Sequence, residues 1–132
     1  KMRVYEMTDH PVARTMIGVP EFNLFGVSYL IKDNDHYSQV ATMGSDMMNE
    51  LEEIVKNADL GSQLVGMMGG SPRRLFNSER PVHAPEDLKG LSIRIQDSPV
   101  EAKVWSALGA QPSPLAWDEL YTGLQSGVID GA

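Results

Sequence analysis

The side chains best suited to chemistry in this sequence are arginines gathered in one stretch of the chain. Residues 71–94 hold five basic residues against three acidic ones, a net charge of +2, although the whole chain carries −7. Residues 33–60 hold seven acidic residues and one lysine, a net charge of −6. An acidic protein with arginine concentrated in one segment fits a local anion site better than a broad basic surface. We therefore expect no nucleic acid or anionic membrane as a partner.

Arg94 lies in the most regular part of this stretch. The run Leu91-Ser92-Ile93-Arg94-Ile95 alternates apolar and polar residues, which predicts a strand over 92–95. An arginine between two isoleucines either lies on a solvated face, as charged residues mostly do, or is a fixed cation directed at an anion. A turn precedes the strand, because Pro85 suits a first helical position and Gly90 can take the left-handed backbone that ends it.

Two glycines precede a second pair of arginines. The run Gly69-Gly70-Ser71-Pro72-Arg73-Arg74 could hold a phosphate through its backbone N–H groups. It could equally be a surface turn leading into a strand over Arg74–Asn77. The nucleotide patterns GxxxxGK[ST] and GxGxxG are both missing from the sequence.

No pattern for catalysis or metal binding is present in the sequence. The three histidines are scattered without HExxH spacing, and the chain has no cysteine to complete a zinc site or form a disulfide. There is no GxSxG nucleophile motif. We therefore expect no enzyme activity, no metal and no cofactor. Arginines, an aromatic residue and amides remain, and these suit ligand binding.

Both helices and strands are predicted along the chain, which has the size and composition of one globular domain. Hydrophobic residues make up 42% of the 132 residues, enough for a core, and no apolar run is long enough to cross a bilayer. Helices are predicted over 36–57, 98–108 and 117–126, and strands over 4–5, 62–68, 74–77, 92–95 and 128–130. Residues 20–31 read as a buried connecting segment, and the prolines keep 111–114 extended.

Two of the predicted helices have identifiable caps and apolar faces. Asp33 to Asp35 offer cap residues for the first, and Ser98 with Glu101 forms a capping box for the second. The stripe expected to face the core from the first helix is Val40, Met43, Met47, Leu51 and Ile54. The methionines in it are interpreted as core filler. Leu120, Tyr121 and Leu124 are expected to point inward from the third helix.

The sequence resembles the substrate-binding proteins of TRAP transporters, of the dicarboxylate-binding type. The motifs that carry the resemblance are RPVHAPEDLKGLSIRI and LGAQPSPLAWDELYTGLQSGVIDGA. The resemblance implies a two-lobed α/β fold of the periplasmic-binding-protein kind. The family's opening strands, its long helix and a signal peptide have no counterpart here, so we expect a central piece. Residues 1–80 would form part of the first lobe and 81–132 the start of the second.

The same resemblance implies a set of ligand-binding residues. Arg94 matches the arginine that pairs with the ligand carboxylate, as suits a planar guanidinium with parallel donors. Arg73 matches a second arginine, although Ser71-Pro72 departs from the family pattern and leaves Arg74 as the alternative. Trp117 matches an aromatic pocket wall. Gln96 falls on the strand face of Arg94, and Asp97 begins a loop facing the cleft. Glu119 and Asp130 also match family positions and are interpreted as structural.

The function implied is capture of a small organic carboxylate outside the cytoplasm, in the periplasm. The ligand would be held between two lobes that close on a hinge, and delivered to a TRAP permease in the membrane. The binding protein itself would not insert into the membrane. The alternative is a phosphate- or nucleotide-handling enzyme or sensor domain on a related two-lobed fold, with the Gly69–Arg74 run as its phosphate loop.

Overall fold

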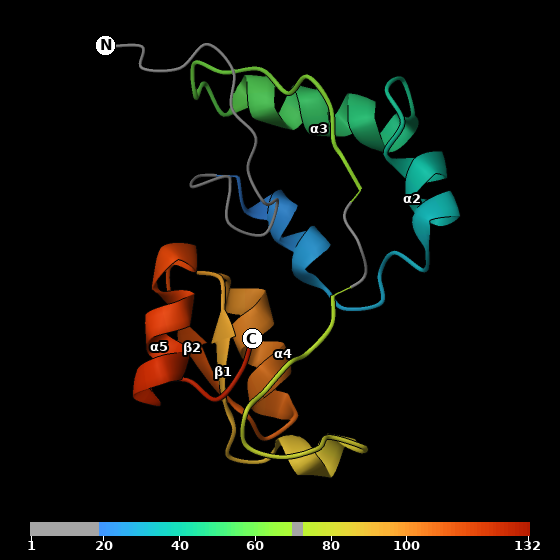
Figure 1. Cartoon of the computed structure of the whole chain (residues 1–132). Helices are drawn as coiled ribbons and strands as arrows, with labels where there is room; N and C mark the ends of the chain where they lie inside the picture. Colours follow the sequence, from blue (N-terminus) through green and yellow to red (C-terminus); the bar gives the residue numbers. More distant parts are fainter. Residues whose placement is uncertain (1–18, 70–72) are drawn as a thin grey trace.

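The computed structural model describes residues 19–69 and 73–132. The strand expected at residues 4–5 lies outside this range. One region of the molecule contains the helices α2 and α3, and another contains two strands with the helices α4 and α5 (Figure 1). Mixed helix and sheet agree with the expected α/β class. Within the described residues, every helix lacks the length and apolar character that crossing a bilayer requires.

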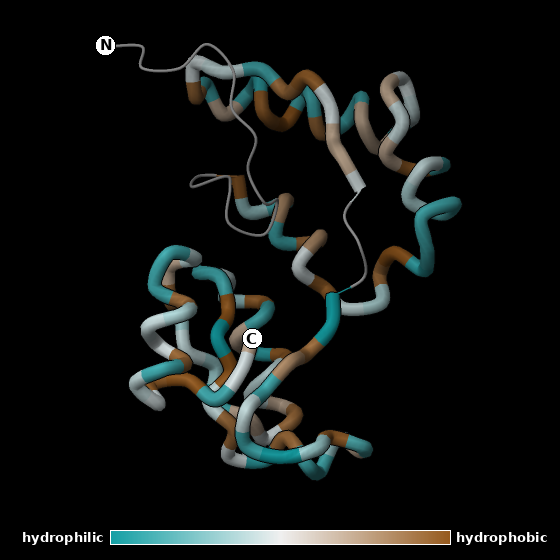
Figure 2. Tube along the Cα trace, in the orientation of Figure 1, coloured by the Kyte–Doolittle hydropathy of each residue, from teal (hydrophilic) through white to brown (hydrophobic). Residues whose placement is uncertain are grey.

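The first region is built on one apolar cluster. This region consists of the 3-10 helix η1 (Pro20–Gly26) and the helices α2 (Asn34–Val40) and α3 (Asp46–Asn57). The buried members of the cluster come from η1 with its preceding residue and from one face of α3: Val19, Phe22, Met48, Leu51 and Val55. The apolar residues of α3 alternate with hydrophilic ones along the helix in Figure 2, as expected for a helix with one buried face.

The single helix predicted over 36–57 is wrong, because the chain forms α2 and α3 with a break between them. Gly44 has a φ of +85°, a left-handed conformation that interrupts a helix. Ser45 then caps α3: its Oγ accepts a bond from the Met48 N–H at 3.3 Å and donates one to the Val40 carbonyl at 2.7 Å. The expected cap of the first helix is confirmed, since Asp33 Oδ1 accepts from the His36 N–H at 2.8 Å.

The break also shifts the apolar face of the second helix. Met48, Leu51 and Val55 are its buried residues, whereas Met43 lies in the break and is 55% exposed. Of the predicted stripe, Leu51 alone is buried, with 6% of its surface exposed. A stripe that assumes one continuous 3.6-residue period cannot survive a turn that resets the phase of the helix.

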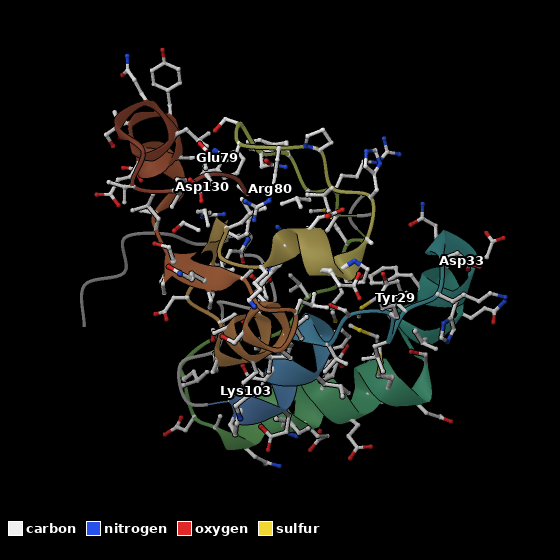
Figure 3. All side chains as sticks on the ribbon, turned by 90° about the horizontal axis from the view of Figure 1, so that it is seen from below. Tyr29, Asp33, Glu79, Arg80, Lys103 and Asp130 are labelled. Atoms are coloured by element: carbon white, nitrogen blue, oxygen red, sulfur yellow. The ribbon has the colours of Figure 1, made fainter. Side chains whose placement is uncertain are left out.

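The segment over 20–31 is less buried than predicted. Phe22 is buried, but four of its apolar residues are exposed: Leu24, Val27, Tyr29 and Leu30. Tyr29 is the extreme case, with 98% of its surface exposed and a φ of +63°. It lies on the connection between η1 and α2, where Figure 3 labels it. The 3-10 geometry of η1 turns one aromatic residue inward and leaves the following connection outside.

The strands predicted over 62–68 and 74–77 are not formed. No other described segment pairs with the backbone of residues 62–68, and an unpaired extended segment is not a strand. The second prediction is reduced to a single bridge residue, Asn77, which pairs with Gly131. The bridge extends over only one residue of this segment, which is too short to form a strand.

The second region is organised around a β-α-β unit. The strand β1 (Ser92–Ile95), the helix α4 (Pro99–Ala107) and the strand β2 (Gln111–Pro114) follow one another, and the strands pair in parallel. The strand β1 and the helix α4 confirm the predictions over 92–95 and 98–108. The predicted extended run over 111–114 is a strand with two prolines. Its pairing survives because the bonds to β1 use the N–H groups of Gln111 and Leu115, with the prolines between.

A second backbone segment covers the other side of β1. The Arg94 N–H donates to the Gly131 carbonyl at 2.7 Å, so residues 130–132 lie against the strand. Phe76 and Ala132 then exchange two backbone bonds at 3.1 and 3.0 Å. The strand predicted over 128–130 is therefore displaced to a bridge at Gly131. β1 thus lies at the centre of this region, and the segments on its two sides pair with its backbone N–H and C=O groups.

The apolar cluster of the second region surrounds β1. Its buried members are Leu88, Leu91, Ile93 and Ala110, with Leu75, Val82 and Trp105 packed against them. The helix predicted over 117–126 begins as the 3-10 helix η3 (Trp117–Glu119) and continues as α5 (Leu120–Ser126). Tyr121 was expected to point inward and is instead 74% exposed. The start in 3-10 geometry rotates the following residues relative to a single α-helix.

The turn before β1 is held by one carboxylate and one guanidinium. The 3-10 helix η2 (Pro85–Leu88) starts at Pro85 as predicted. Asp87 Oδ2 accepts bonds from the His83 and Ala84 N–H groups at 2.9 and 3.0 Å, and these bonds lower the pKa of Asp87. Arg80 donates from Nε to the Asp87 carbonyl and from Nη2 to the Lys89 carbonyl. Gly90 then ends the turn with the expected left-handed φ of +79°.

Candidate functional site

Arg94 is a buried cation, not a residue of a solvated face. It is the third residue of β1, and only 9% of it is exposed. Its Nε–H donates to the Leu115 carbonyl at 2.9 Å. Its guanidinium carbon lies 5.5 Å from the centroid of the Trp117 ring. Hydrogen bonds that involve a charged group contribute about 1.5–3 kcal/mol, so this guanidinium is held in one orientation.

Trp117 meets Arg94 with the face of its ring. The residue begins η3 and remains 72% exposed, although it lies beside a buried cation. A tryptophan face carries partial negative charge and attracts a cation within about 6 Å. The structure thus brings together two of the predicted site residues, Arg94 and Trp117.

Gln96 and Asp97 follow directly after β1. Gln96 is partly buried, its N–H donates to Glu101 Oε2 at 3.4 Å, and its side-chain Oε1 is buried without a hydrogen-bond partner among the described residues. Asp97 is exposed. Their roles toward a ligand stay predictions, because neither contacts Arg94 or Trp117 through a hydrogen bond described in the structure.

Arg73 and Arg74 both have exposed side chains and follow residues 70–72, which lie outside the described range. Half of the expected phosphate loop over Gly69–Arg74 therefore lies outside the described residues. Arg73 stays the predicted second site arginine, with Arg74 as the alternative.

Two acidic residues near the site have structural roles, as interpreted from the sequence. Asp130 Oδ2 accepts from the Ser92 N–H at 2.7 Å, which ties the 130–132 segment to the start of β1. Glu119 Oε2 accepts from the Ala116 N–H at 3.3 Å at the start of η3. Both carboxylates satisfy backbone donors at the ends of elements. Among the described residues, no cluster of three or more potential metal ligands occurs.

The main site group that sequence reasoning missed is the carbonyl of Leu115. A backbone acceptor carries no residue-type signature, so only the path of the chain can reveal it. The available signal was the order strand, helix, extended segment, which is typical of a β-α-β unit with parallel strands. That order would have placed residues 111–115 beside β1, and hence Leu115 beside Arg94.

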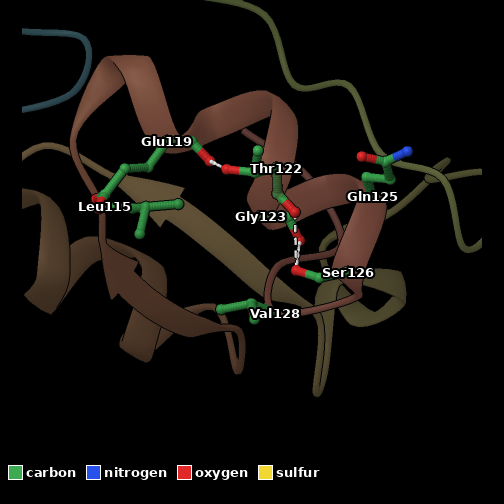
Figure 4. A pocket seen from close by; sticks show the side chains of 7 residues that line it. All are labelled: Leu115, Glu119, Thr122, Gly123, Gln125, Ser126 and Val128. Atoms are coloured by element: carbon green, nitrogen blue, oxygen red, sulfur yellow. Dashed lines mark hydrogen bonds between the residues drawn. The ribbon is translucent and has the colours of Figure 1, made fainter.

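A hollow near these residues lies on α5, and Arg94 is not among the residues that line it. It has a volume of about 510 Å³ and is lined by residues of the η3–α5 segment and its flanks: Leu115, Glu119, Thr122, Gly123, Gln125, Ser126 and Val128. Figure 4 shows that its hydroxyls bond within the helix. Thr122 donates to the Glu119 carbonyl at 3.0 Å, and Ser126 to the Thr122 carbonyl at 2.7 Å. Because these groups satisfy the helix itself, we place the candidate site at Arg94.

The chain matches the family described as bacterial extracellular solute-binding protein, family 7, over residues 3–132. It is 38% identical over 113 residues to a solute-binding protein of Sulfitobacter sp. (strain NAS-14.1). The aligned residues make up 85% of this chain and 33% of that protein. The chain thus spans about a third of the length of the curated relatives it matches.

Solved structures of TRAP periplasmic solute-binding proteins have the same fold over most of the chain. The protein from Anaerococcus prevotii, with bound D-glucuronate, matches with a TM-score of 0.82 and 30% identity, covering 92% of this chain and 38% of that one. The protein from Sulfurospirillum deleyianum, with bound succinate, matches with a TM-score of 0.79 and 31% identity, covering 87% and 36%. These neighbours are two-lobed, and the chain covers part of them.

Proposed function

The chain belongs to bacterial extracellular solute-binding protein family 7, and from this membership we propose that it captures a small organic carboxylate and delivers it to a TRAP-type permease. Capture takes place outside the cytoplasm, as the family description implies. The protein binds and releases its ligand without chemical change. The permease is proposed from the family and from the TRAP neighbours.

The observation that carries this proposal is the burial of Arg94 together with its fixed orientation. Only 9% of Arg94 is exposed, and a charge in such a buried position interacts more strongly with an anion than a charge in water does. The Leu115 carbonyl and the Trp117 ring hold the guanidinium in place before any ligand arrives. A planar guanidinium so held can form two parallel hydrogen bonds with a carboxylate, which a lysine cannot.

The ligand class follows from the same charge. Neighbours at 30% and 31% identity hold D-glucuronate and succinate, and both molecules carry a carboxylate. We propose an acid of this kind for the present chain, with Arg73, Gln96 and Asp97 as further contacts. The alternative of a phosphate- or nucleotide-handling protein is not favoured, because the likenesses are to carboxylate-binding proteins.

We also propose that residues up to 80 belong to the first lobe and residues from 81 to the second. Two separate apolar clusters support this division, one on η1 and α3 and the other around β1. The segment from Leu75 to Ser78 already lies against the second region, because Leu75 packs on its cluster and the Ser78 N–H donates to the Asp130 carbonyl, so the chain passes between the two clusters shortly before residue 80. The ligand would then lie where the chain passes from one lobe to the other.

Calorimetric titration of the full-length protein with D-glucuronate and succinate tests the proposal. We expect at least one of these acids to bind and Arg94→Ala to weaken that binding strongly. Losing one partner of a desolvated charge pair costs about 2–5 kcal/mol, which corresponds to roughly thirty- to several-thousand-fold in the dissociation constant. Arg94→Lys keeps the charge but loses the two parallel donors of the guanidinium and the Nε–H bond to Leu115, so this variant should also bind the acid weakly.

Lys103→Ala is the matched control, because Lys103 is an exposed cation on α4 (Figure 3). Its removal changes the net charge as much as Arg94→Ala does, yet the affinity should stay within about twofold of the original. Equal affinities for the original protein and Arg94→Ala would remove Arg94 from the site. Binding of inorganic phosphate or a nucleotide in preference to both acids would favour the alternative function.

A further inference from the structure

We infer that Trp117 is a positioning residue for Arg94: its ring holds the guanidinium in the orientation needed for ligand binding. The family resemblance implies only a pocket wall at this position, and a wall would contact the ligand. The structure shows the ring at the cation instead, 5.5 Å from the guanidinium carbon. Because Arg94 matters only if it meets the ligand, this role rests on the proposed function.

Two groups that contact the Arg94 guanidinium belong to one short loop. Leu115 accepts from the Nε–H of Arg94 at 2.9 Å, and Trp117 follows two residues later. The loop is itself tied to the strand that carries the arginine, since the Leu115 N–H donates to the Ile95 carbonyl at 3.3 Å. Ile95 of β1 thus holds the loop in place through its carbonyl, and the loop in turn holds the side chain of Arg94.

The two contacts restrain the guanidinium in different ways. A hydrogen bond to Nε restrains the group within its own plane, because it is directional along the N–H bond. A ring lying over the cation restrains tilting out of that plane, because the attraction is to the face of the ring. A long arginine side chain loses considerable rotamer freedom on ordering. Restraining it in the free protein lowers the entropy cost of ligand binding.

The exposure of Trp117 separates this role from a packing role. The ring is 72% exposed, so most of its surface takes no part in the core. Trp105 is the contrasting residue, because it packs against the apolar cluster around β1. Changes at Trp117 should therefore leave the fold intact and act through Arg94. The expected loss of affinity for Trp117→Leu is about two- to thirty-fold.

Fluorinated tryptophans distinguish the two roles. Successive fluorine atoms withdraw electron density from the ring face and weaken its attraction for a cation, while the ring keeps nearly the same size. We expect the dissociation constant for D-glucuronate or succinate to rise stepwise from tryptophan to the mono-, di- and trifluoro forms. The same series in a Trp117→Phe background should show no trend, because every other tryptophan is equally fluorinated there. An affinity that stays flat across the first series overturns the positioning role.

A measurement on the ligand-free protein keeps the test independent of the proposed function. The Arg94 Nε–H resonance, identified by its loss in Arg94→Lys, should be shifted by the ring current of Trp117 and protected from exchange with water. In Trp117→Leu we expect the shift to disappear and exchange to become faster. If that change occurs but neither acid binds, the proposed function fails and the positioning of Arg94 stands. If the resonance is the same in both proteins, the inference fails.

Discussion

Replacing Gly131 with alanine tests the backbone arrangement on which the site depends. Gly131 lies between β1 and the segment around Asn77, and it pairs with Ile93 on one side and Asn77 on the other. A Cβ atom at this position would collide with the Phe76 carbonyl oxygen and would lie 2.8 Å from the Asn77 Cβ. Because the nearest obstacle is backbone, no side-chain rotation can relieve the overlap.

The expected cost of Gly131→Ala can be worked out from these contacts. Overpacking that forces the backbone to shift costs about 1–3 kcal/mol. If the shift also breaks the two bonds between Phe76 and Ala132, each adds about 0.5–1.5 kcal/mol. The total is about 2–6 kcal/mol, a large part of a typical stability of about 5–15 kcal/mol. Ligand affinity should fall as well, since the Gly131 carbonyl accepts the Arg94 N–H.

Gly127→Ala is the matched control for this prediction. Gly127 ends α5 with a φ of +73°, and nothing lies within 4 Å of a Cβ built there. Alanine at Gly127 therefore suffers the left-handed backbone penalty of about 1–2 kcal/mol and no collision. Urea unfolding of the two full-length variants, followed by circular dichroism, compares them directly. If Gly131→Ala proves no more destabilising than Gly127→Ala, the close approach of the 76–78 and 130–132 segments is wrong.

Three further predictions concern single groups. The backbone bonds that lower the pKa of Asp87 stabilise the fold at pH values above the ordinary aspartate pKa of about 3.9. This contribution is lost as the pH falls through the lowered pKa of the folded protein. In Asp87→Asn, the free energy of unfolding should therefore decrease less steeply with falling pH than in the original protein. Tyr37 has a buried hydroxyl without a partner among the described residues, so Tyr37→Phe should leave the unfolding midpoint in urea unchanged or raise it, and a loss above about 1 kcal/mol would contradict the burial. Ser98 Oγ caps α4 at 3.2 Å from the Glu101 N–H, so Ser98→Ala should cost about 0.5–2 kcal/mol in the same assay, whereas an unchanged midpoint would rule out the cap.

Elements set by local chemistry could be predicted from the sequence. The turn from Pro85 to Gly90, the cap at Ser98 and the strand β1 each depend on residues within a few positions of one another, and all three are confirmed. The site prediction at Arg94 benefited in the same way, because the strand had to be correct before its third residue could be placed. The family resemblance assigned Trp117 to the pocket wall and Arg94 to the ligand carboxylate; the contact between the two side chains is seen only in the structure.

The incorrect predictions depended on partners distant in the sequence or on one residue's conformation. Residues 62–68 have the composition of a strand, but strand formation requires a backbone partner that composition does not specify. The helix over 36–57 failed at Gly44, whose left-handed conformation is allowed for glycine but not dictated by it. β2 was missed as a strand because two prolines in four residues argue against one, and only the register with β1 shows that their missing N–H groups were not needed.

The site at Arg94 illustrates why ligand binding is harder to predict than the elements that carry it. The arginine itself is visible in the sequence, yet what makes it suitable for an anion is contributed by backbone groups of two other segments. The Gly131 carbonyl fixes its main chain, and the Leu115 carbonyl fixes its Nε. The carbonyl of Leu115 offers its bond whatever the side chain, whereas the carbonyl of Gly131 needs a residue without a side chain to come so close. A substitution at Leu115 that preserves the loop should therefore leave Arg94 in place, whereas a change in the loop's length should release it.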